Sequence, residues 1–417
     1  ERGLSRNASA HFLKASLLVF AAVEAAEGGQ DPIPRLDAAL AEIGQALEFN
    51  PENPGYWSRL AEIRMSRNWA RLEHGEIDQP AIEQSLDAIR KSLRIKPFDS
   101  YTLNLRGLIY RQQAYVAMME GAYQRPSLRQ ALASLEEAHR LKPEETTSMH
   151  NLALTYTDLS LYEFNYGQDP RDSARRALEW ADKAMALGPG ITYLAVVRSN
   201  TLFVFAAFEL KTGGDGTALR RYLEASREAV RTNPDSHQAQ IMLCQANELF
   251  ARWQFRQSQS PDRAIVAALE AGRQAVALNP SNPYSQHVLA QACLAGVEWQ
   301  LDRGQDPRKW LAEAENNARQ ALRLNPADIE MTLLMAKVKR WNAAAARSRK
   351  RDPGPDARSA LALLAAADRM DAREPRVPAL QAQCWLLLAS GETDPARKRE
   401  AAAKAAAFLD EATRRDP

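Results

Sequence analysis

Apolar side chains between residues 52 and 97 recur at steps of three and four in two segments. The first segment runs from about residue 54 to 73 and the second from about residue 80 to 95, with polar sequence between them. This spacing is typical of amphipathic α-helices, because an α-helix has 3.6 residues per turn. No run in the chain alternates strictly at two-residue steps. The pattern therefore predicts an all-α protein.

The two-helix pattern repeats about every 46 residues, which indicates a repeat array. A turn-forming proline ends most repeats, and Ala372 takes the remaining position: Pro51, Pro97, Pro143, Pro189, Pro234, Pro280, Pro326 and Pro417. The predicted fold is about nine antiparallel helix pairs in a single repeat domain, 1–417. The predicted repeats are 1–51, 52–97, 98–143, 144–189, 190–234, 235–280, 281–326, 327–372 and 373–417.

Two columns of small residues keep the same period and predict positions where helices approach closely. The column in the first helix consists of Ala15, Ala61, Gly107, Ala153, Ser199, Cys244, Ala290, Ala336 and Ala382. The column in the second helix consists of Ala46, Ser92, Ala138, Ala184, Ala229, Ala275, Ala321, Ala367 and Ala412.

The segments between helices carry turn chemistry. Gly-Gln-Asp-Pro follows the first helix of several repeats, ending at Pro32, Pro170 and Pro307. There we expect a left-handed glycine, an aspartate that caps the next helix and a proline in its first turn. Asn-Pro closes the second helix at Pro51, Pro234, Pro280 and Pro326. A residue before proline is pushed out of the α region, so the helix should end there.

Leu-Ala in the first helix and endings such as Ala-Leu-Arg-Leu-Asn-Pro (321–326) resemble the tetratricopeptide repeat across essentially the whole chain. The usual unit of that family has 34 residues, so these units are longer. HEAT and armadillo repeats lack the Asn-Pro ending. The resemblance implies a right-handed α-α superhelix whose first helices line a concave groove. The long repeats and the connector also resemble, more weakly, the repeat region of bacterial serine/threonine protein kinases.

Composition narrows the function. The net charge is +2, which argues against a nucleic-acid or membrane-surface partner. Arginine outnumbers lysine, which favours a bacterial source.

Cys244, Cys293 and Cys384 are predicted to be buried free thiols. This favours a location in the cytoplasm, with the periplasm as the alternative. The apolar run 15–22 is too short to span a bilayer. The chain begins at Glu1, and we read it as a fragment of a longer protein.

Four features suggest chemistry, and each has a structural alternative. Lys-Thr-Gly-Gly-Asp-Gly at 211–216 could be mistaken for a phosphate loop but is interpreted as a turn. The apolar stretch 191–210 is either a partner hot spot or a buried helix. A basic cluster, with Trp341 between its members, is either an anion-binding patch or a solvated loop. Its members are Lys337, Lys339, Arg340, Arg347, Arg349, Lys350 and Arg351.

The fourth feature is a pair of histidines, His150 and His287, which occupy the same repeat position. They are either structural residues or contacts to a partner. The six histidines show no metal-binding spacing, and no catalytic grouping is present. We therefore expect no cofactor and no catalysis by this fragment; a kinase or other catalytic domain would lie outside it.

The leading hypothesis is a scaffold that binds a protein or peptide in the concave groove. The alternative is the regulatory or sensory region of a larger bacterial enzyme. The predicted groove residues are Ser58, Glu62, Asn104, Arg111, His150, Asn200, Gln245, His287, Gln291, Lys337 and Arg340.

Overall fold

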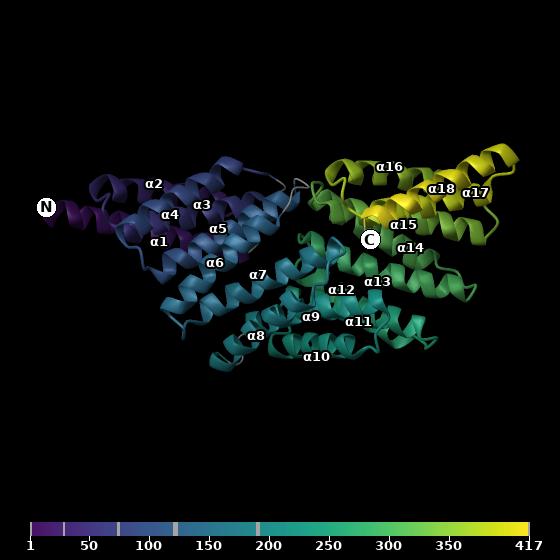
Figure 1. Ribbon diagram of the computed structural model, residues 1–417, viewed down its shortest axis with the longest axis horizontal. Coiled ribbons are helices and arrows are strands. Elements are labelled where there is room, and N and C mark those ends of the chain that lie inside the picture. The colour runs from purple at the N-terminus through teal and green to yellow at the C-terminus, as the bar shows by residue number, and fades with distance from the viewer. Residues whose placement is uncertain (1, 28–29, 73–75, 120–123, 189–191, 416–417) are drawn as a thin grey trace. The chain divides into compact units, whose positions relative to one another are not determined.

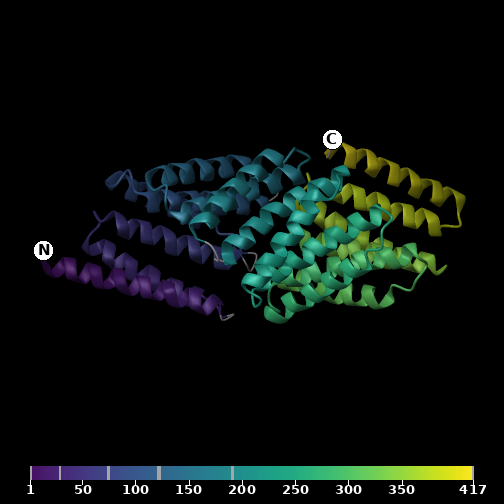
Figure 2. The ribbon, with the colours of Figure 1, turned by 90° about the horizontal axis from the view of Figure 1, so that it is seen from below.

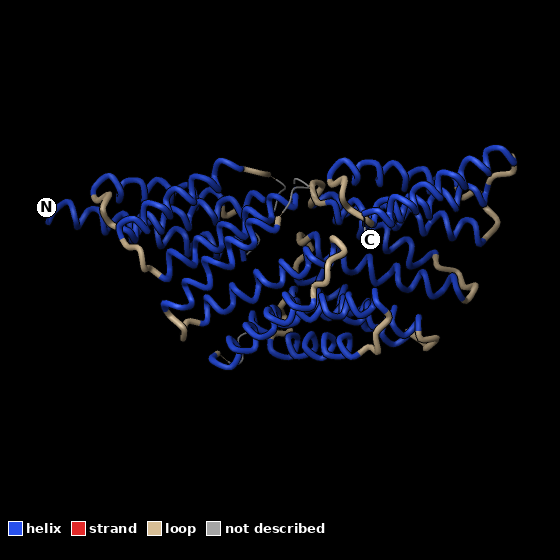
Figure 3. Tube along the Cα trace, in the orientation of Figure 1, coloured by secondary structure: helices blue, strands red, loops and turns tan. Residues whose placement is uncertain are grey.

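The computed structural model describes residues 2–27, 30–72, 76–119, 124–188 and 192–415. These residues form eighteen α-helices and no strand (Figures 1 and 3). The prediction of an all-α fold with about nine helix pairs is confirmed. Consecutive helices of a pair run antiparallel, as Figure 2 also shows.

The first helix of each repeat carries an odd number and the second an even number. The odd-numbered helices are α1 (Arg2–Glu27), α3 (Pro54–Leu72), α5 (Ser100–Met119), α7 (Thr146–Asn165), α9 (Thr192–Thr212), α11 (His237–Arg256), α13 (Pro283–Asp302), α15 (Ile329–Ser348) and α17 (Arg376–Gly391). The even-numbered helices are α2 (Ile33–Phe49), α4 (Gln79–Ile95), α6 (Arg125–Leu141), α8 (Arg171–Leu187), α10 (Thr217–Thr232), α12 (Asp262–Leu278), α14 (Arg308–Leu324), α16 (Gly354–Met370) and α18 (Pro395–Arg415).

The chain divides into two compact units. Unit 1 comprises Glu1–Met118 and Ala122–Thr155, and unit 2 comprises Met119–Gly121 and Tyr156–Pro417. The division falls within α7, so a repeat boundary does not separate the two units. The single-domain organisation and the repeat boundaries expected from the sequence stay predictions.

The helix ends follow the local sequence. Asn50, Asn233, Asn279 and Asn325 each end an even-numbered helix in a non-helical conformation, as Asn-Pro predicts; Asn50 has φ −149° and ψ 82°. Gly167 and Gly304 have positive φ, whereas Gly29 lies outside the described residues. The aspartate acts one position earlier than expected. Proline occupies the N-cap position, and the Asp169 and Asp306 carboxylates accept from the N–H groups of Arg171 and Arg308.

The small-residue columns lie at helix contacts. Every member of the first column is buried, and a Cβ added to Gly107 would lie 2.5 Å from Leu135 Cγ. The second column is buried from Ala46 to Ala367 and is half-buried only at Ala412 in the terminal helix. Larger side chains would therefore overlap a neighbouring helix at these positions.

The three cysteines are free and buried, as expected. Burial raises the pKa of the Cys293 and Cys384 thiols, and it raises the pKa of Cys244 well above its ordinary value. Such thiols stay protonated at neutral pH and are poor nucleophiles.

The odd-numbered helices of unit 2 pack on one another in series: α9 on α11, α11 on α13, α13 on α15 and α15 on α17. No comparable contact is found between two even-numbered helices among α10, α12, α14, α16 and α18, all of which lie in the described part of unit 2. In a curved stack, the helices on the inside of the curve lie closest together. The odd-numbered helices therefore line the concave face of unit 2.

One stretch of α1, Asn7–Ala26, is long and apolar enough to cross a membrane by length and composition alone. It is longer than the apolar run 15–22, which by itself is too short to span a bilayer. In this structure α1 packs against α2, and Leu13, Leu17 and Phe20 remain more than half exposed.

Candidate functional site

The eleven predicted groove residues fall into two sets. Five lie in unit 1, from Ser58 to His150, and six lie in unit 2, from Asn200 to Arg340. The two sets have different environments, and only the second forms a continuous polar row on the described helices.

In unit 1 the predicted residues are engaged within the protein. Ser58 is 1% exposed, and its hydroxyl lies 2.8 Å from that of Ser92 and 2.7 Å from that of Thr102. Glu62 accepts hydrogen bonds from Arg59 and from the Tyr101 hydroxyl. These groups join neighbouring helices of the array, and Ser58 is not accessible to a partner here.

Asn104 and His150 in unit 1 are also buried, at 7% and 6% exposure. The Asn104 side-chain oxygen accepts from Asn151 Nδ2 at 3.0 Å. Burial, assisted by the nearby Arg111 guanidinium, lowers the pKa of His150 to about 4. His150 is therefore neutral at pH 7 and faces the protein interior.

In unit 2 one polar position recurs on successive concave-face helices. It is Asn200 on α9, Gln245 on α11, Gln291 on α13 and Lys337 on α15, and all four side chains are half-buried. Gln245 accepts only a long hydrogen bond, 3.5 Å, from the Tyr222 hydroxyl. The side chains of Asn200 and Gln291 make no hydrogen bond with any described residue. Their donors and acceptors remain available to another molecule.

Lys337 and Arg340 stand out because neither has a carboxylate within ion-pair distance among the described residues. Burial and the nearby Arg376 lower the pKa of Lys337 to about 8. Burial lowers the pKa of Arg340 to about 10. The Arg340 guanidinium lies 3.8 Å from the centre of the Trp341 ring, and its buried Nε has no hydrogen-bond partner in the described structure. The part of the chain that is described thus provides neither cation with a counter-ion.

Two ion pairs between adjacent repeats flank these cations. Arg252 on α11 lies 3.3 Å from Glu298 on α13, and Arg376 Nη1 on α17 donates to Glu330 Oε2 on α15 at 3.0 Å. Burial favours the neutral acid, but Arg376 outweighs it and lowers the pKa of Glu330 to about 2. The arginines beside Lys337 are thus neutralised by carboxylates, whereas no described carboxylate pairs with Lys337.

His287 lies deep in the same face, 9% exposed, with Nδ1 unpaired among the described groups. Burial lowers its pKa to about 4; Glu330 opposes this, whereas Lys337 and Arg376 add to it. His287 is therefore a neutral, buried group at pH 7.

The basic cluster predicted at 337–351 is not one patch. Lys339 extends from α15 toward α14 and α16, where it pairs with Glu315 at 2.9 Å and Asp356 at 3.7 Å. Arg349 pairs with Asp306. Arg347 is exposed in the last turn of α15, and Arg349, Lys350 and Arg351 lie beyond its end at Ser348. Lys337 and Arg340 are the two members that adjoin the predicted groove row.

Two other features take their structural interpretation. Residues 211–216 form a turn, and the Glu209 carboxylate accepts hydrogen bonds from the N–H groups of Gly216, Thr217 and Leu219. A carboxylate of the protein itself thus occupies the place that a phosphate would take in a phosphate loop. In the stretch 191–210, Val197 and Leu202 are buried, and Phe203 packs against the core. The side chains of residues 191–196 lie outside those described.

Four residues of this face were not predicted from the repeat pattern: Arg252, Glu298, Glu330 and Arg376. Opposite charges one repeat apart, at 252/298 and at 330/376, could have indicated them. Among the described residues, no group of three or more His, Cys, Asp or Glu side chains could hold a metal ion.

No family model matches the chain, and no curated protein matches it. Solved structures of similar helical architecture include TTC0263, a thermophilic tetratricopeptide-repeat protein of Thermus thermophilus, at 20% identity and a TM-score of 0.38 over 55% of this chain and 98% of that one. YrrB, described as a tetratricopeptide-repeat protein with an unusual peptide-binding site, matches at 15% identity and a TM-score of 0.35. The match covers 59% of this chain and 96% of YrrB. Human IFIT1, in a dimer with PPP-AAAA, matches at 14% identity and a TM-score of 0.46. The match covers 99% of this chain and 94% of the IFIT1 chain. These are similarities of architecture alone.

Proposed function

We propose that this chain is a non-catalytic scaffold that binds an extended acidic segment of a partner protein along the concave face of unit 2. The observation that carries the proposal is a row of four polar side chains: Asn200, Gln245, Gln291 and Lys337. The row ends at Lys337 and the adjacent Arg340, and neither cation has a carboxylate partner among the described residues. Each member lies on the next odd-numbered helix, so the row crosses four successive repeats.

The amide side chains suit a peptide backbone. Each glutamine or asparagine offers one acceptor and two donors, which match the N–H and C=O groups of an extended chain. These amides provide no strong preference for one sequence. They would position a segment across the helices without selecting its side chains.

The cations supply the preference for charge. Lys337 and Arg340 are half-buried, and an incoming carboxylate would regain for them the electrostatic stabilisation that burial removes. Arg252 pairs with both Glu248 and Glu298, and Arg376 pairs with both Glu330 and Glu374, so this part of the face carries little excess positive charge. This favours a segment with a few acidic side chains over a long polyanion such as RNA.

The test is selection of binders from a random-peptide display library on the whole chain, followed by fluorescence anisotropy. We expect acidic peptides, bound about ten-fold or more weakly by K337Q/R340Q. Lys339→Gln is the matched control, since Lys339 lies on α15 but pairs with Glu315. Failure to select any peptide, equal affinity in K337Q/R340Q, or tighter binding of an oligoadenylate RNA would contradict the proposal.

A further inference from the structure

A polar pocket of about 330 Å³ lies in unit 1 between α2, α3 and α4. One face of α3 supplies Arg64, Arg67, Asn68 and Arg71 from two turns of helix. The other walls are apolar or polar residues and one carboxylate, that of Asp78 at the start of α4: Leu40, Gly44, Leu60, Asp78, Ala81 and Gln84. The pocket is separate from the row proposed to bind a peptide in unit 2.

Asn68 is the unusual member of this pocket. It is 2% exposed, and neither its side-chain oxygen nor its nitrogen has a hydrogen-bond partner among the described residues. A buried amide left without partners costs about 1–3 kcal/mol for each group. Asn68 therefore needs a molecule in the pocket that both donates and accepts.

Arg64 lacks a counter-ion in the described structure. Its Nη1 donates to the Gln84 carbonyl at 3.0 Å, and no described carboxylate lies within ion-pair distance of it. Burial lowers the pKa of this guanidinium, although Asp87 partly opposes that effect. Arg67 and Arg71 are held by Asp37 at 2.5 Å and Asp78 at 2.7 Å. Each of the three guanidinium groups retains further N–H donors.

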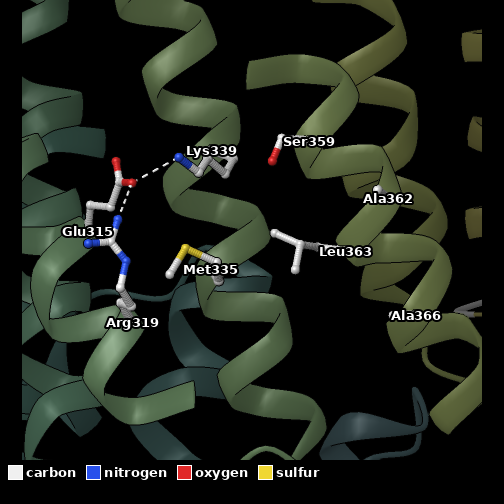
Figure 4. A pocket seen from close by; sticks show the side chains of 8 residues that line it. All are labelled: Glu315, Arg319, Met335, Lys339, Ser359, Ala362, Leu363 and Ala366. Atoms are coloured by element: carbon white, nitrogen blue, oxygen red, sulfur yellow. Dashed lines mark hydrogen bonds and ion pairs between the residues drawn. The ribbon is translucent and has the colours of Figure 1, made fainter. Parts of the chain in front are cut away.

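A second pocket of about 440 Å³ occupies the same repeat position six repeats later, between α14, α15 and α16 (Figure 4). Lys339 takes the place of Arg64, Met335 that of Leu60, and Glu315 that of Leu40. In Figure 4 the Glu315 carboxylate meets both Lys339 and Arg319, at 2.9 Å each. This pocket carries its own anion.

The comparison identifies what the α2–α4 pocket lacks. Leu40 is apolar where Glu315 provides a carboxylate, and Asn68 is a buried amide where Ala343 is a buried methyl group. Asp78, the carboxylate that lines the α2–α4 pocket, is paired with Arg71. As far as the described residues extend, Arg64 thus has no carboxylate partner and Asn68 has no hydrogen-bond partner. A ligand with anionic oxygens and a hydroxyl would satisfy both.

We infer that the pocket between α2, α3 and α4 binds the phosphate group of a small molecule, with Arg64 as its cationic contact and Asn68 as its hydrogen-bonding contact. The oxygens of a phosphate accept from guanidinium N–H groups and from Asn68 Nδ2. A P–OH or an adjacent hydroxyl donates to Asn68 Oδ1. The volume exceeds that of phosphate itself, which leaves room for a small sugar or polyol.

The experiment is hydrogen exchange of the whole chain with inorganic phosphate, ribose 5-phosphate, ribose or acetate, each at one ionic strength set with sodium chloride. We expect saturable protection in peptides from residues 33–95 with the two phosphates, tighter for ribose 5-phosphate. Tighter binding of inorganic phosphate would assign the pocket to the free ion and overturn the small-molecule assignment. Equal protection by acetate, or by sodium chloride alone, would overturn the inference.

Two variants and one control locate the effect. Arg64→Gln should weaken phosphate binding about ten-fold or more, and Asn68→Ala should weaken it while leaving the unliganded protein as stable as the wild type or more so. Lys337→Gln in unit 2 should leave the protection of residues 33–95 unchanged. Unaltered phosphate affinity in both pocket variants would overturn the inference, as would a large loss of unliganded stability in Asn68→Ala.

Discussion

The hydroxyl of Tyr166 donates a hydrogen bond to Asp371 Oδ2 at 2.8 Å, although the two residues lie 205 positions apart in the sequence. Tyr166 follows α7, and Asp371 caps the end of α16. The stack of unit 2 therefore curves far enough to bring residues of the predicted repeats 144–189 and 327–372 into contact. Burial and the Asp371 carboxylate raise the pKa of Tyr166, which keeps the phenol protonated as a donor. Arg373 also lies over the Tyr166 ring, at 5.2 Å.

Tyr166→Phe should loosen both ends of this contact. Loss of a half-buried hydrogen bond to a carboxylate should lower the free energy of unfolding of unit 2 by about 1 kcal/mol. Hydrogen exchange should accelerate at the end of α7 and around residues 371–376. Tyr284→Phe is the control, because its hydroxyl donates to Asp328, which lies in the adjacent repeat. Acceleration confined to one side in Tyr166→Phe would show that the contact does not join the two regions.

Ala290→Leu should destabilise unit 2 by about 1–3 kcal/mol. Ala290 is fully buried, so a larger side chain must displace its neighbours. Denaturant unfolding measures the effect. Gln305→Ala, at an exposed position in the turn before α14, should change stability by less than about 0.5 kcal/mol. Equal effects of the two substitutions would show that the small-residue column does not mark a helix contact.

His287 should make unit 2 sensitive to acid. Its pKa is about 4 in the folded protein and about 6.5 when unfolded, so the unfolded chain binds more protons between those values. The stabilisation is complete above the unfolded pKa and is lost as the pH falls toward 4. From about pH 7 to about pH 5 we expect a loss of about 2 kcal/mol, and His287→Gln should remove that part. An identical pH profile in the variant would contradict the burial of a neutral imidazole.

The terminal helix should exchange fastest. Only Ala401 and Ala405 are buried among the described residues of α18, whereas α13 buries residues on nearly all sides. A terminal repeat has one neighbour, and each repeat is stabilised mainly by its nearest neighbours. Hydrogen exchange by mass spectrometry should therefore show α18 amides exchanging well before those of α13. Equal protection would indicate one cooperative unit.

The helices, their order and most of their ends could be predicted from the sequence. In the second repeat the structure places α3 at Pro54–Leu72 and α4 at Gln79–Ile95, within one residue of the expected bounds. Asn-Pro ends α2, α10, α12 and α14 as expected, because the steric effect of proline on the preceding residue is local. The resemblance to kinase-associated repeats, the absence of a nucleic-acid partner and the cellular location stay predictions.

The candidate site was less accessible to sequence reasoning. Repeat position alone placed Ser58, His150, His287 and Lys337 on one helix face, but the first three are buried and only Lys337 is half-exposed. The exposed fraction of a side chain depends on which side chains of the neighbouring repeat pack against it. Ser92 and Thr102 enclose Ser58, for example, and no local pattern encodes that contact.

The sequence by itself determined the repeat length, the helix pairs, the buried small-residue columns and the turns, because each depends on side chains three or four positions apart or on one backbone conformation. The tertiary structure alone decided which charges are neutralised. Lys339 and Lys337 are two residues apart, yet of the two only Lys339 meets a described carboxylate, since they leave α15 on different sides and face different helices. Likewise, only the curvature of unit 2 brings Tyr166 to Asp371, because curvature sums many small rotations between repeats that no single stretch of sequence specifies.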